Sequence, residues 1–443
     1  MIGSYQSSLL DGIIRQGLRA GFQHQWLRNI LTHAVSEFSK RGLGTDYCGY
    51  HNIDHELEVT LFTLLTTSNQ TGNFVITQKE QHYLFVAALF HDYDPSKQFD
   101  KPNEDKIEQV IRSDPKIRKF IEEVDLDINL VIALIHRTAY PFNGEIAKHA
   151  LARMNQLFTD AGISESDHQS RKRYTDLGWF LSVADRIAAY ALGDFDHAVD
   201  MARRNAHSLS WHPSVINRNS VTYFAMLKEE REILDWVLRG ASKKHIQNFE
   251  SNIRSFEEAW QKEKDAKKAK LKLQVSVVEN KSKNKNKNEK LNNDIFSKVL
   301  KLYRESPILF KVTEEIFKRT LFDKDSILIT LRLGSVNSEI IGYAKGGPLE
   351  IYNLRPGTFD HNLGLRNTAY LEGIGIDQHY RGETGGHMLR LAFLSEANKL
   401  GYRFVTGYAH RDVINQRIKK GEQIETVHKY DPDNLDYYRI TLY

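Results

Sequence analysis

The chain has 443 residues, of which 41% are apolar and 27% are charged, a composition typical of folded proteins and long enough for two or three domains. Its single cysteine, Cys48, excludes an intramolecular disulfide and a structural zinc site built from cysteines. The first residues lack the pattern of a signal peptide, and no apolar run approaches the roughly 18 residues of a membrane span. We therefore expect a cytoplasmic protein with no membrane partner.

The net charge of +4 is distributed unevenly along the chain. Residues 262–290 contain eleven lysines and four acidic residues, a local charge of +7, so the remainder carries −3. A basic folded surface is not expected, which argues against a body that binds nucleic acid. The KNKNKN run has no apolar face, and we predict a disordered linker over 261–292. Binding of nucleic acid through these lysines is the alternative role.

The N-terminal part of the chain is predicted to be an all-α domain over residues 1–260. Apolar residues recur there at helical spacing, and clusters of Gly, Pro, Ser and Asn separate the periodic segments. These helical segments are 9–22, 55–68, 82–93, 128–138, 175–195 and 222–240.

The C-terminal part, residues 293–443, has a different pattern and predicts an α/β domain with a mixed, mostly antiparallel sheet. A helix over 294–322 precedes runs rich in β-branched and aromatic residues, which are typical of strands. The runs are 326–334, 339–347, 368–376, 402–410 and 436–443. A second helix over 385–401 separates the third and fourth runs, and a short helix over 412–422 precedes the last two strands.

Histidines and aspartates occur on several of the predicted N-terminal helices. His91 and Asp92 end a strongly apolar run, and Asp185 lies inside another apolar helix. Polar groups at such positions are costly unless they are compensated, and a divalent cation would compensate them. A spacing of four predicts that His51 and His55 share one helix face. The alternative for Asp185 is pairing with an arginine, since Arg186 is adjacent.

The order His, His-Asp, Asp resembles the HD superfamily of metal-dependent phosphohydrolases over about residues 45–240. Two motifs are similar to the cyclic-nucleotide phosphodiesterase branch of that superfamily: Tyr50-His51-Asn52-x-x-His55-x-x-x-Val59 and His91-Asp92-Tyr93-Asp94-Pro95. The resemblance implies four ligands for Mn, Mg, Zn or Fe, with Asp92 able to bridge to a second ion. The implied ligands are His55, His91, Asp92 and Asp185. It also implies that His51 is the general acid for the leaving oxygen.

The substrate stays open, because the glutamine and the aromatic clamp with which phosphodiesterases hold a purine cannot be assigned in this sequence. Cyclic nucleotides, nucleoside monophosphates, deoxynucleoside triphosphates and alarmones are all candidates. His136 is a further candidate ligand, and its alternative role is to interact with a helix C-terminus. Cations that could meet substrate phosphates are Arg137, Arg171, Lys172 and Arg173.

A glycine-rich turn lies between a predicted strand and a predicted helix near residue 380, an arrangement that can hold a diphosphate at the helix N-terminus. With the order of the flanking elements, it resembles the GNAT acetyltransferases over about residues 305–443. Their acetyl-CoA loop follows Arg/Gln-x-x-Gly-x-Gly/Ala, from which this chain departs only at Thr384. The implied acetyl-CoA-binding residues are Arg381, Gly382, Glu383, Thr384, Gly385 and Gly386.

The same resemblance makes Glu372 a candidate general base for acetyl transfer. The tyrosine that serves as general acid in many GNAT members is replaced here, since Ile418 stands at about its position. Tyr430, Tyr437 and Tyr438 are the candidates to substitute for it. We expect an enzyme with two catalytic domains, and the alternative is a sensor in which one domain binds a nucleotide or acetyl-CoA and regulates the other.

Overall fold

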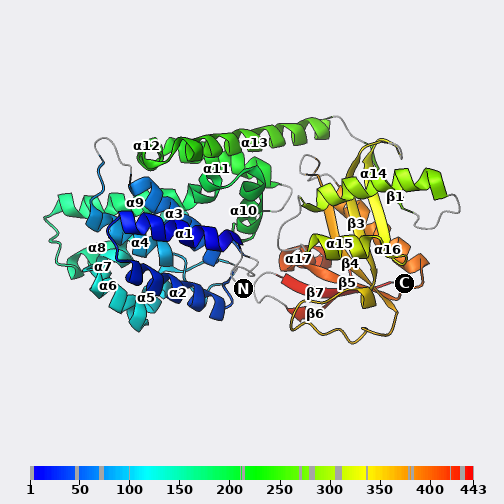
Figure 1. Ribbon diagram of the computed structural model, residues 1–443, viewed down its shortest axis with the longest axis horizontal. Helices are drawn as coiled ribbons and strands as arrows, with labels where there is room; N and C mark the ends of the chain where they lie inside the picture. The colour runs from blue at the N-terminus through cyan, green and yellow to red at the C-terminus, as the bar shows by residue number, and fades with distance from the viewer. Residues whose placement is uncertain are drawn as a thin grey trace. The chain divides into compact units, whose positions relative to one another are not determined.

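The computed structural model shows two compact units (Figure 1). The first unit holds Met1–Leu209 and Ser220–Ser255, and the second holds the remainder of the chain. The described residues are 4–44, 49–68, 74–98, 100–209, 211, 215–268, 272–278, 285–304, 312–335, 338–377, 380, 384–419, 421–429 and 435–442.

The chain is helical as far as residue 268, in agreement with the prediction from apolar periodicity. The helices are α1 (Ser4–Arg19), α2 (His24–Lys40), α3 (Ile53–Thr67), α4 (Gln78–Phe90), α5 (Glu104–Ser113), α6 (Pro115–Glu123), α7 (Ile128–His136), α8 (Gly144–Asp160), α9 (His168–Leu192), α10 (Phe195–Ser208), α11 (Ile216–Glu229), α12 (Arg231–Gly240) and α13 (Lys243–Lys268). One expected helix, 222–240, is two helices that meet at Glu230. Within the described residues, no helix is both long and apolar enough to cross a bilayer.

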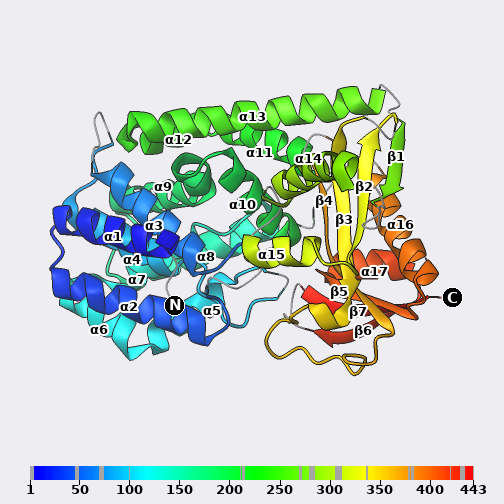
Figure 2. The same ribbon diagram turned by 45° about the vertical axis from the view of Figure 1, so that its right-hand side comes forward.

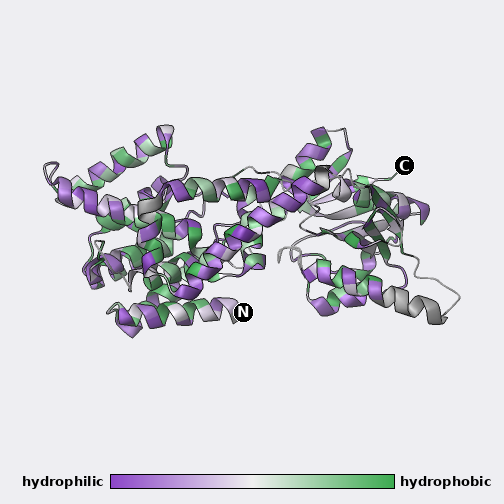
Figure 3. Ribbon diagram, turned by 90° about the horizontal axis from the view of Figure 1, so that it is seen from above, coloured by the Kyte–Doolittle hydropathy of each residue, from purple (hydrophilic) through white to green (hydrophobic). Residues whose placement is uncertain are grey.

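Helix α3 lies at the centre of the N-terminal unit and contacts α1, α2, α4, α9 and α12. Nearly every residue of α3 is buried, and α4, α7 and α9 contribute long buried stretches around it. Phe62, Phe85 and Phe180 are fully enclosed, each of which stabilises the fold by about 1.5–3 kcal/mol through burial of apolar surface. Figure 3 shows hydrophobic and hydrophilic residues interspersed along the outer helices.

The C-terminal unit is built on a seven-stranded sheet with the order β1-β2-β3-β4-β5-β7-β6. Every neighbouring pair is antiparallel except β4 and β5, which are parallel, so the predicted mixed and mostly antiparallel sheet is confirmed. The strands are β1 (Leu273–Val277), β2 (Ile327–Leu333), β3 (Ile340–Pro348), β4 (Thr368–Ile376), β5 (Phe404–His410), β6 (Ile424–Lys429) and β7 (Leu435–Thr441).

Helices cover both faces of this sheet (Figure 2). Leu389 and Phe393 of α16 (Gly385–Lys399) pack on one face against Leu331 and its neighbours. On the other face, α14 (Lys285–Arg304) and α15 (Glu314–Leu321) pack against Tyr343 and Leu328. The remaining helix is α17 (Arg411–Lys419), which contacts β5 and β6.

Two expectations about this half of the chain need correction. Strand β1 lies inside the segment expected to be a linker, because Val275 and its neighbours pair with β2 at the edge of the sheet. Helix α14 begins at Lys285, within the KNKNKN run expected to be disordered, and its later residues Ile295 and Val299 supply the buried face. The single helix expected over 294–322 is also replaced by α14 and α15.

Candidate functional site

The N-terminus of α3 brings the first candidate ligand, His55, into the core of the helical unit. Asn52 caps the helix, because its side-chain oxygen accepts hydrogen bonds from the backbone N–H groups of Asp54 (3.0 Å) and His55 (3.1 Å). His51 therefore precedes the helix, and the prediction that His51 and His55 share a helix face was wrong. The two imidazole rings still lie close, with centroids 5.9 Å apart.

The structure brings together the four residues expected to bind a metal ion. His91 caps the C-terminus of α4, Asp92 follows it, and Asp185 projects from α9. His55 Nε2 lies 3.3 Å from Asp92 Oδ2 and 3.1 Å from Asp185 Oδ1. His91 Nε2 lies 3.2 and 3.5 Å from the same two atoms. The candidate ligand atoms of all four residues lie within 4.8 Å of one another.

This donor set fits a divalent cation. Ligand atoms about 2.1 Å from one ion are separated from each other by roughly 3.0–3.4 Å, which is close to the separations observed here. Both ring nitrogens of His55 and Nε2 of His91 are buried and have no hydrogen-bond partner among the described residues. Two imidazoles and two carboxylates suit zinc, manganese or iron, and magnesium if waters complete the shell.

The pKa shifts within this group of four residues also indicate a cation site. Burial opposes a charge on His55, but the carboxylates of Asp185 and Asp92 outweigh it and raise the pKa of His55 to about 10. Burial also works against the charged form of Asp92, and the imidazoles of His91 and His51 nevertheless hold its pKa well below the usual range. The two carboxylates thus demand positive charge between them, which a cation can supply in place of protons.

Another carboxylate, that of the buried Glu56, contacts two of the candidate ligands, His91 and Asp92. Glu56 Oε2 lies 3.0 Å from His91 Nδ1, and Glu56 Oε1 accepts a hydrogen bond from the backbone N–H of Asp92 (3.2 Å). His91 Nδ1 also hydrogen-bonds the Ala88 carbonyl (3.0 Å), so this carbonyl and Glu56 together hold the ring with Nε2 directed toward the other candidate ligands. Glu56 was not predicted from the sequence, because it is one of three acids near the start of α3, with Asp54 and Glu58, and no local pattern distinguishes it from them.

His51 is held by a second unforeseen acid, Asp100. His51 Nδ1 lies 3.4 Å from Asp100 Oδ1, and His51 Nε2 lies 3.8 Å from Asp92 Oδ2. Asp100 is fully buried and also accepts a hydrogen bond from the backbone N–H of Tyr50 (2.7 Å). Burial of His51 works against its charged form, but Asp100 and Asp92 raise its pKa overall. A protonated imidazole with Nδ1 fixed is suited to donating a proton from Nε2.

His136 lies outside the group of four. Its Nε2 is 3.2 Å from Glu108 Oε2, and together with Asp105 these residues form a separate cluster. Glu108 also accepts hydrogen bonds from Arg112 Nε (2.7 Å) and Arg153 Nε (2.9 Å). Although burial disfavours its charge, these cations lower the pKa of Glu108 to about 2. With two guanidiniums already on this carboxylate, the cluster is a poor cation site.

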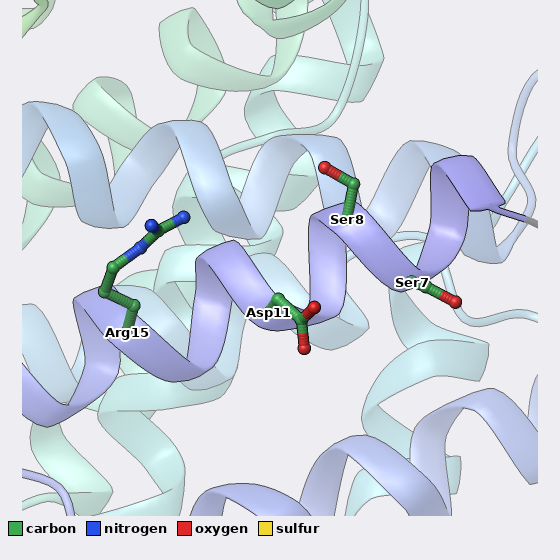
Figure 4. A pocket seen from close by; sticks show the side chains of 4 residues that line it. All are labelled: Ser7, Ser8, Asp11 and Arg15. Carbon is green, nitrogen blue, oxygen red and sulfur yellow. The ribbon is translucent and has the colours of Figure 1, made fainter.

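A shallow depression on α1 is lined by Ser7, Ser8, Asp11 and Arg15 (Figure 4). All four residues are exposed and come from one helix, with Asp11 and Arg15 one turn apart. Binding sites for small molecules are normally enclosed and lined by groups from several elements, and this depression is neither.

In the C-terminal unit, Glu372 lies on β4 where the register with β3 shifts. Its Oε2 accepts hydrogen bonds from the ammonium of Lys345 on β3 and from the hydroxyl of Thr320 on α15 (3.2 Å). Lys345 is fully buried, its ammonium lies 4.2 Å from the centre of the Phe317 ring, and burial holds its pKa well below the usual range. The candidate base is therefore engaged by a lysine that the sequence analysis did not identify.

Strand β4 leaves room for a ligand beside it. Its pairing with β5 is confined to Thr368, Ala369 and Tyr370, although β4 continues to Ile376. A side chain added at Gly373 would meet nothing within 4 Å. An unpaired strand edge with open space beside it can bind an extended ligand through its backbone. This arrangement fits the pantetheine arm and acyl group of an acyl-CoA.

The expected loop for acetyl-CoA lies partly outside the described residues, which exclude Arg381, Gly382 and Glu383. Thr384 is the N-cap of α16, and Gly385 and Gly386 form its first turn. A Cβ on Gly385 would approach Leu331 Cδ2 to 2.7 Å, so this position needs glycine for packing.

The candidate acids for acetyl transfer differ in their surroundings. Tyr437 is fully buried, and its hydroxyl lies 2.7 Å from both Thr406 Oγ1 and Asp360 Oδ2. Tyr438 is buried with its hydroxyl 3.4 Å from Arg417 Nη1, and Ile418 is exposed on α17. Tyr430 lies outside the described residues. Tyr438 is therefore the better candidate, because both hydrogen bonds of Tyr437 are internal.

No family model matches the chain, and no curated protein matches it. Three solved structures illustrate the similarity that exists. One is a GCN5-related N-acetyltransferase from Kribbella flavida, with 15% identity and a TM-score of 0.27, covering 38% of this chain and 98% of that chain. Another is an N-acetyltransferase from Staphylococcus aureus Mu50, with 17% identity and a TM-score of 0.24, covering 39% and 99%. The third is Tetrahymena GCN5, with 13% identity and a TM-score of 0.26, covering 38% and 96%. At TM-scores below 0.3, these similarities support no conclusion about the fold or the activity of this chain.

Proposed function

We propose that the helical unit is a metal-dependent hydrolase of phosphoric esters. The observation that supports it is the convergence of four candidate ligands from three helices or their ends: the buried His55 and His91 and the partly buried Asp92 and Asp185. Residues that far apart in sequence rarely place two imidazoles and two carboxylates around one point unless a cation is bound there. A nucleotide or a related phosphate ester is the proposed substrate class.

The chain's own residues would perform three tasks. The four ligands would hold the ion, and Glu56 would orient His91 toward it. When bound, the ion would lower the pKa of a water molecule and offset charge on the phosphoryl oxygens. His51 would donate its proton from Nε2 to the departing alkoxide oxygen, while Asp100 fixes the ring and raises its pKa.

The test is a double variant, His91→Ala with Asp92→Ala, assayed on a panel of nucleotides and p-nitrophenyl phosphates with Mn²⁺. We expect the wild type to hydrolyse members of the panel, to lose the activity in EDTA and to recover it with added metal. The double variant should lose both activity and bound metal. The exposed His24→Ala variant is the matched control and should behave as wild type. Unchanged activity in the double variant would refute the proposal.

A second activity is proposed for the C-terminal unit, namely binding of an acyl-CoA and transfer of its acyl group to an amine. The divergence of β4 and β5 after Tyr370 and the open space at Gly373 favour it. Backbone groups of β4 and the turn before α16 would bind the cofactor, and Glu372 would accept the proton of the attacking amine once Lys345 no longer engages it.

The domain boundary is proposed to lie before β1.

Gly373→Val tests the second activity without disturbing the core, because valine suits a strand and would only fill the open space. Calorimetric titration should show at least a tenfold weaker affinity for acetyl-CoA, with unchanged circular dichroism. Thr426→Val provides the control, since it places the same side chain at an exposed position of strand β6, away from β4. Equal affinity in wild type and Gly373→Val would exclude this cofactor site.

A further inference from the structure

A buried arginine with an unused hydrogen-bonding group lies near the proposed hydrolase centre. Arg137 is the residue after α7, and its Cβ packs 2.6 Å from where a Cβ on Gly178 would be. Gly178, Ser182 and Asp185 are spaced by four and three residues, so they share one face of α9. Arg137 thus contacts the helix about 10 Å along its axis from the candidate ligand Asp185.

Two aromatic rings enclose the Arg137 guanidinium. Its carbon lies 3.5 Å from the centre of the Phe142 ring and 3.6 Å from the centre of the Trp179 ring. Arg137 is only 8% exposed, and its Nη1 is buried without a hydrogen-bond partner among the described residues. Stacking holds the plane of the guanidinium in place, and Nη1 at its edge keeps N–H donors that no described residue uses.

A second arginine shares the same indole but is already neutralised. The guanidinium carbon of Arg186 lies 5.0 Å from the Trp179 ring centre. Its two terminal nitrogens donate to Glu230 (3.1 and 2.7 Å), and its Nε donates to the Ser182 carbonyl (2.9 Å). Burial, together with repulsion from Arg186, lowers the pKa of Arg137 to about 9. One buried positive charge is left without an acidic partner of its own, and an anion would compensate it.

We propose that Arg137 binds a second phosphoryl group of the substrate, so that the hydrolase acts on nucleotides or other esters that carry at least two phosphoryl groups. This inference rests on the proposed phosphohydrolase function. Arg186 would flank the same group while its pairing with Glu230 keeps it in place. Phosphate oxygens are bound well by a planar guanidinium, because two parallel N–H groups can donate to two oxygens.

The first experiment measures binding without hydrolysis. Methylenediphosphonate, a non-hydrolysable analogue of pyrophosphate, is titrated by calorimetry into the full-length protein in EDTA at pH 7.5. We expect the wild type to bind and Arg137→Gln to bind at least tenfold more weakly. Arg137→Lys should show an intermediate loss, because lysine keeps the positive charge but lacks the two parallel N–H donors of a guanidinium. Arg118→Ala, an exposed arginine of α6, should bind as wild type. Equal binding by wild type and Arg137→Gln would overturn the proposal.

The second experiment compares substrates. With Mn²⁺ present, Arg137→Gln should raise KM at least tenfold for a nucleoside di- or triphosphate and leave KM for bis(p-nitrophenyl) phosphate within twofold. A loss of the same size for both substrates would contradict the subsite and indicate a structural role. If the wild type hydrolyses neither substrate, the phosphohydrolase proposal fails, whereas the titration in EDTA still decides whether Arg137 binds a diphosphate.

Discussion

At the scale of single residues, His51 and Asp100 form the pair on which proton donation depends. His51 precedes the helix that carries His55, and the buried Asp100 holds it through Nδ1. Lys97 reinforces the arrangement, because its ammonium donates to the His51 carbonyl (3.0 Å) and lies 3.8 Å from Asp100. The ring is thus positioned by contacts that do not involve the candidate metal ligands.

The role of His51 can be tested through the leaving group. Replacing His51 with alanine should reduce kcat by about 100-fold or more for an ester with an alkyl alcohol as leaving group, which needs a proton. The same variant should lose less than about fivefold with p-nitrophenolate, which departs without one. Equal losses with both leaving groups in steady-state assays would show that His51 acts otherwise. Asp100→Asn should also lose more activity with the alkyl leaving group than with p-nitrophenolate, but the difference should be smaller than in His51→Ala.

A second residue-scale prediction concerns the buried pair of Glu58 and His197. His197 Nε2 lies 3.0 Å from Glu58 Oε1, which also accepts a hydrogen bond from Tyr5 (2.6 Å). Burial lowers the pKa of His197, but the Glu58 carboxylate outweighs it and the net pKa is raised. A raised pKa stabilises the fold at a pH below the unfolded value of about 6.5, and this stabilisation is lost as the pH rises through the folded value.

The His197→Asn variant should therefore show a strongly lowered midpoint of urea unfolding at pH 6, because it leaves Glu58 buried without its cation. Between pH 6 and pH 9 the gap between the variant and the wild type should shrink, since His197 loses its charge as the pH rises through its raised pKa in the folded state. The midpoints can be followed by circular dichroism. A gap that is the same at pH 6 and pH 9 would argue against the charged pair.

At the scale of secondary-structure elements, the ends of helices position the candidate ligands. Asn52 determines where α3 begins, and His91 lies where α4 ends. Asp185 is the exception, because it projects from the middle of α9. An ion at this point would join the start of one helix to the end of another, so the geometry of those ends should control metal affinity.

Asn52→Ala removes both capping hydrogen bonds and should cost about 1 kcal/mol of helix stability. Because His55 loses its fixed position, metal affinity should fall several-fold in a competition assay with a chelating dye. Asn52→Asp keeps an oxygen that can cap the helix and loses only the Nδ2 hydrogen bond to the Gly49 carbonyl (3.2 Å), so it should retain more of the metal affinity than Asn52→Ala. The control is Asn143→Ala, because Asn143 begins α8 without a side-chain capping bond. Loss of affinity in both alanine variants would contradict the capping argument.

At the scale of the whole molecule, the chain consists of two units with separate cores. The helical unit buries α3 among α1, α4 and α9, and the sheet of the other unit buries Leu331 beneath α16 and Tyr343 beneath α14. Each proposed site lies wholly within one unit. A ligand bound at one of these sites should therefore stabilise only the unit that contains the site.

Differential scanning calorimetry should resolve two transitions. A metal ion at 100 times its dissociation constant should stabilise the helical unit by about 2.7 kcal/mol. The midpoint temperature of the other transition should not change. Acetyl-CoA should raise only the transition of the sheet-containing unit. The double variant His91→Ala with Asp92→Ala should abolish the first shift and preserve the second. A single transition shifted by both ligands would show that the two units unfold as one.

The sequence by itself identified the four residues that meet in the N-terminal candidate site, together with the helical class of the first half of the chain and the mixed α/β class of the second. Apolar periodicity predicted the helices and strands, because the burial of a face repeats along the chain in steps set by the local geometry. His91, Asp92 and Asp185 were identifiable because each interrupts an apolar stretch, whereas His55, which lies between Asp54 and Glu56, was implied by the resemblance to the HD pattern. The position of β1 was not predicted, although Leu273, Val275 and Val277 alternate with polar residues, because this short segment lies between lysine-rich stretches and was grouped with them as a linker.

Only the tertiary structure decided which partners these residues have. Asp100 lies 49 positions after His51, and Glu56 lies 35 before His91, so no local pattern could pair them. Lys345 and Glu372 likewise meet only because β3 and β4 are adjacent in the sheet. The periodicity of a sequence reports that a side chain is buried, whereas the side chain it meets depends on how distant helices and strands pack against each other.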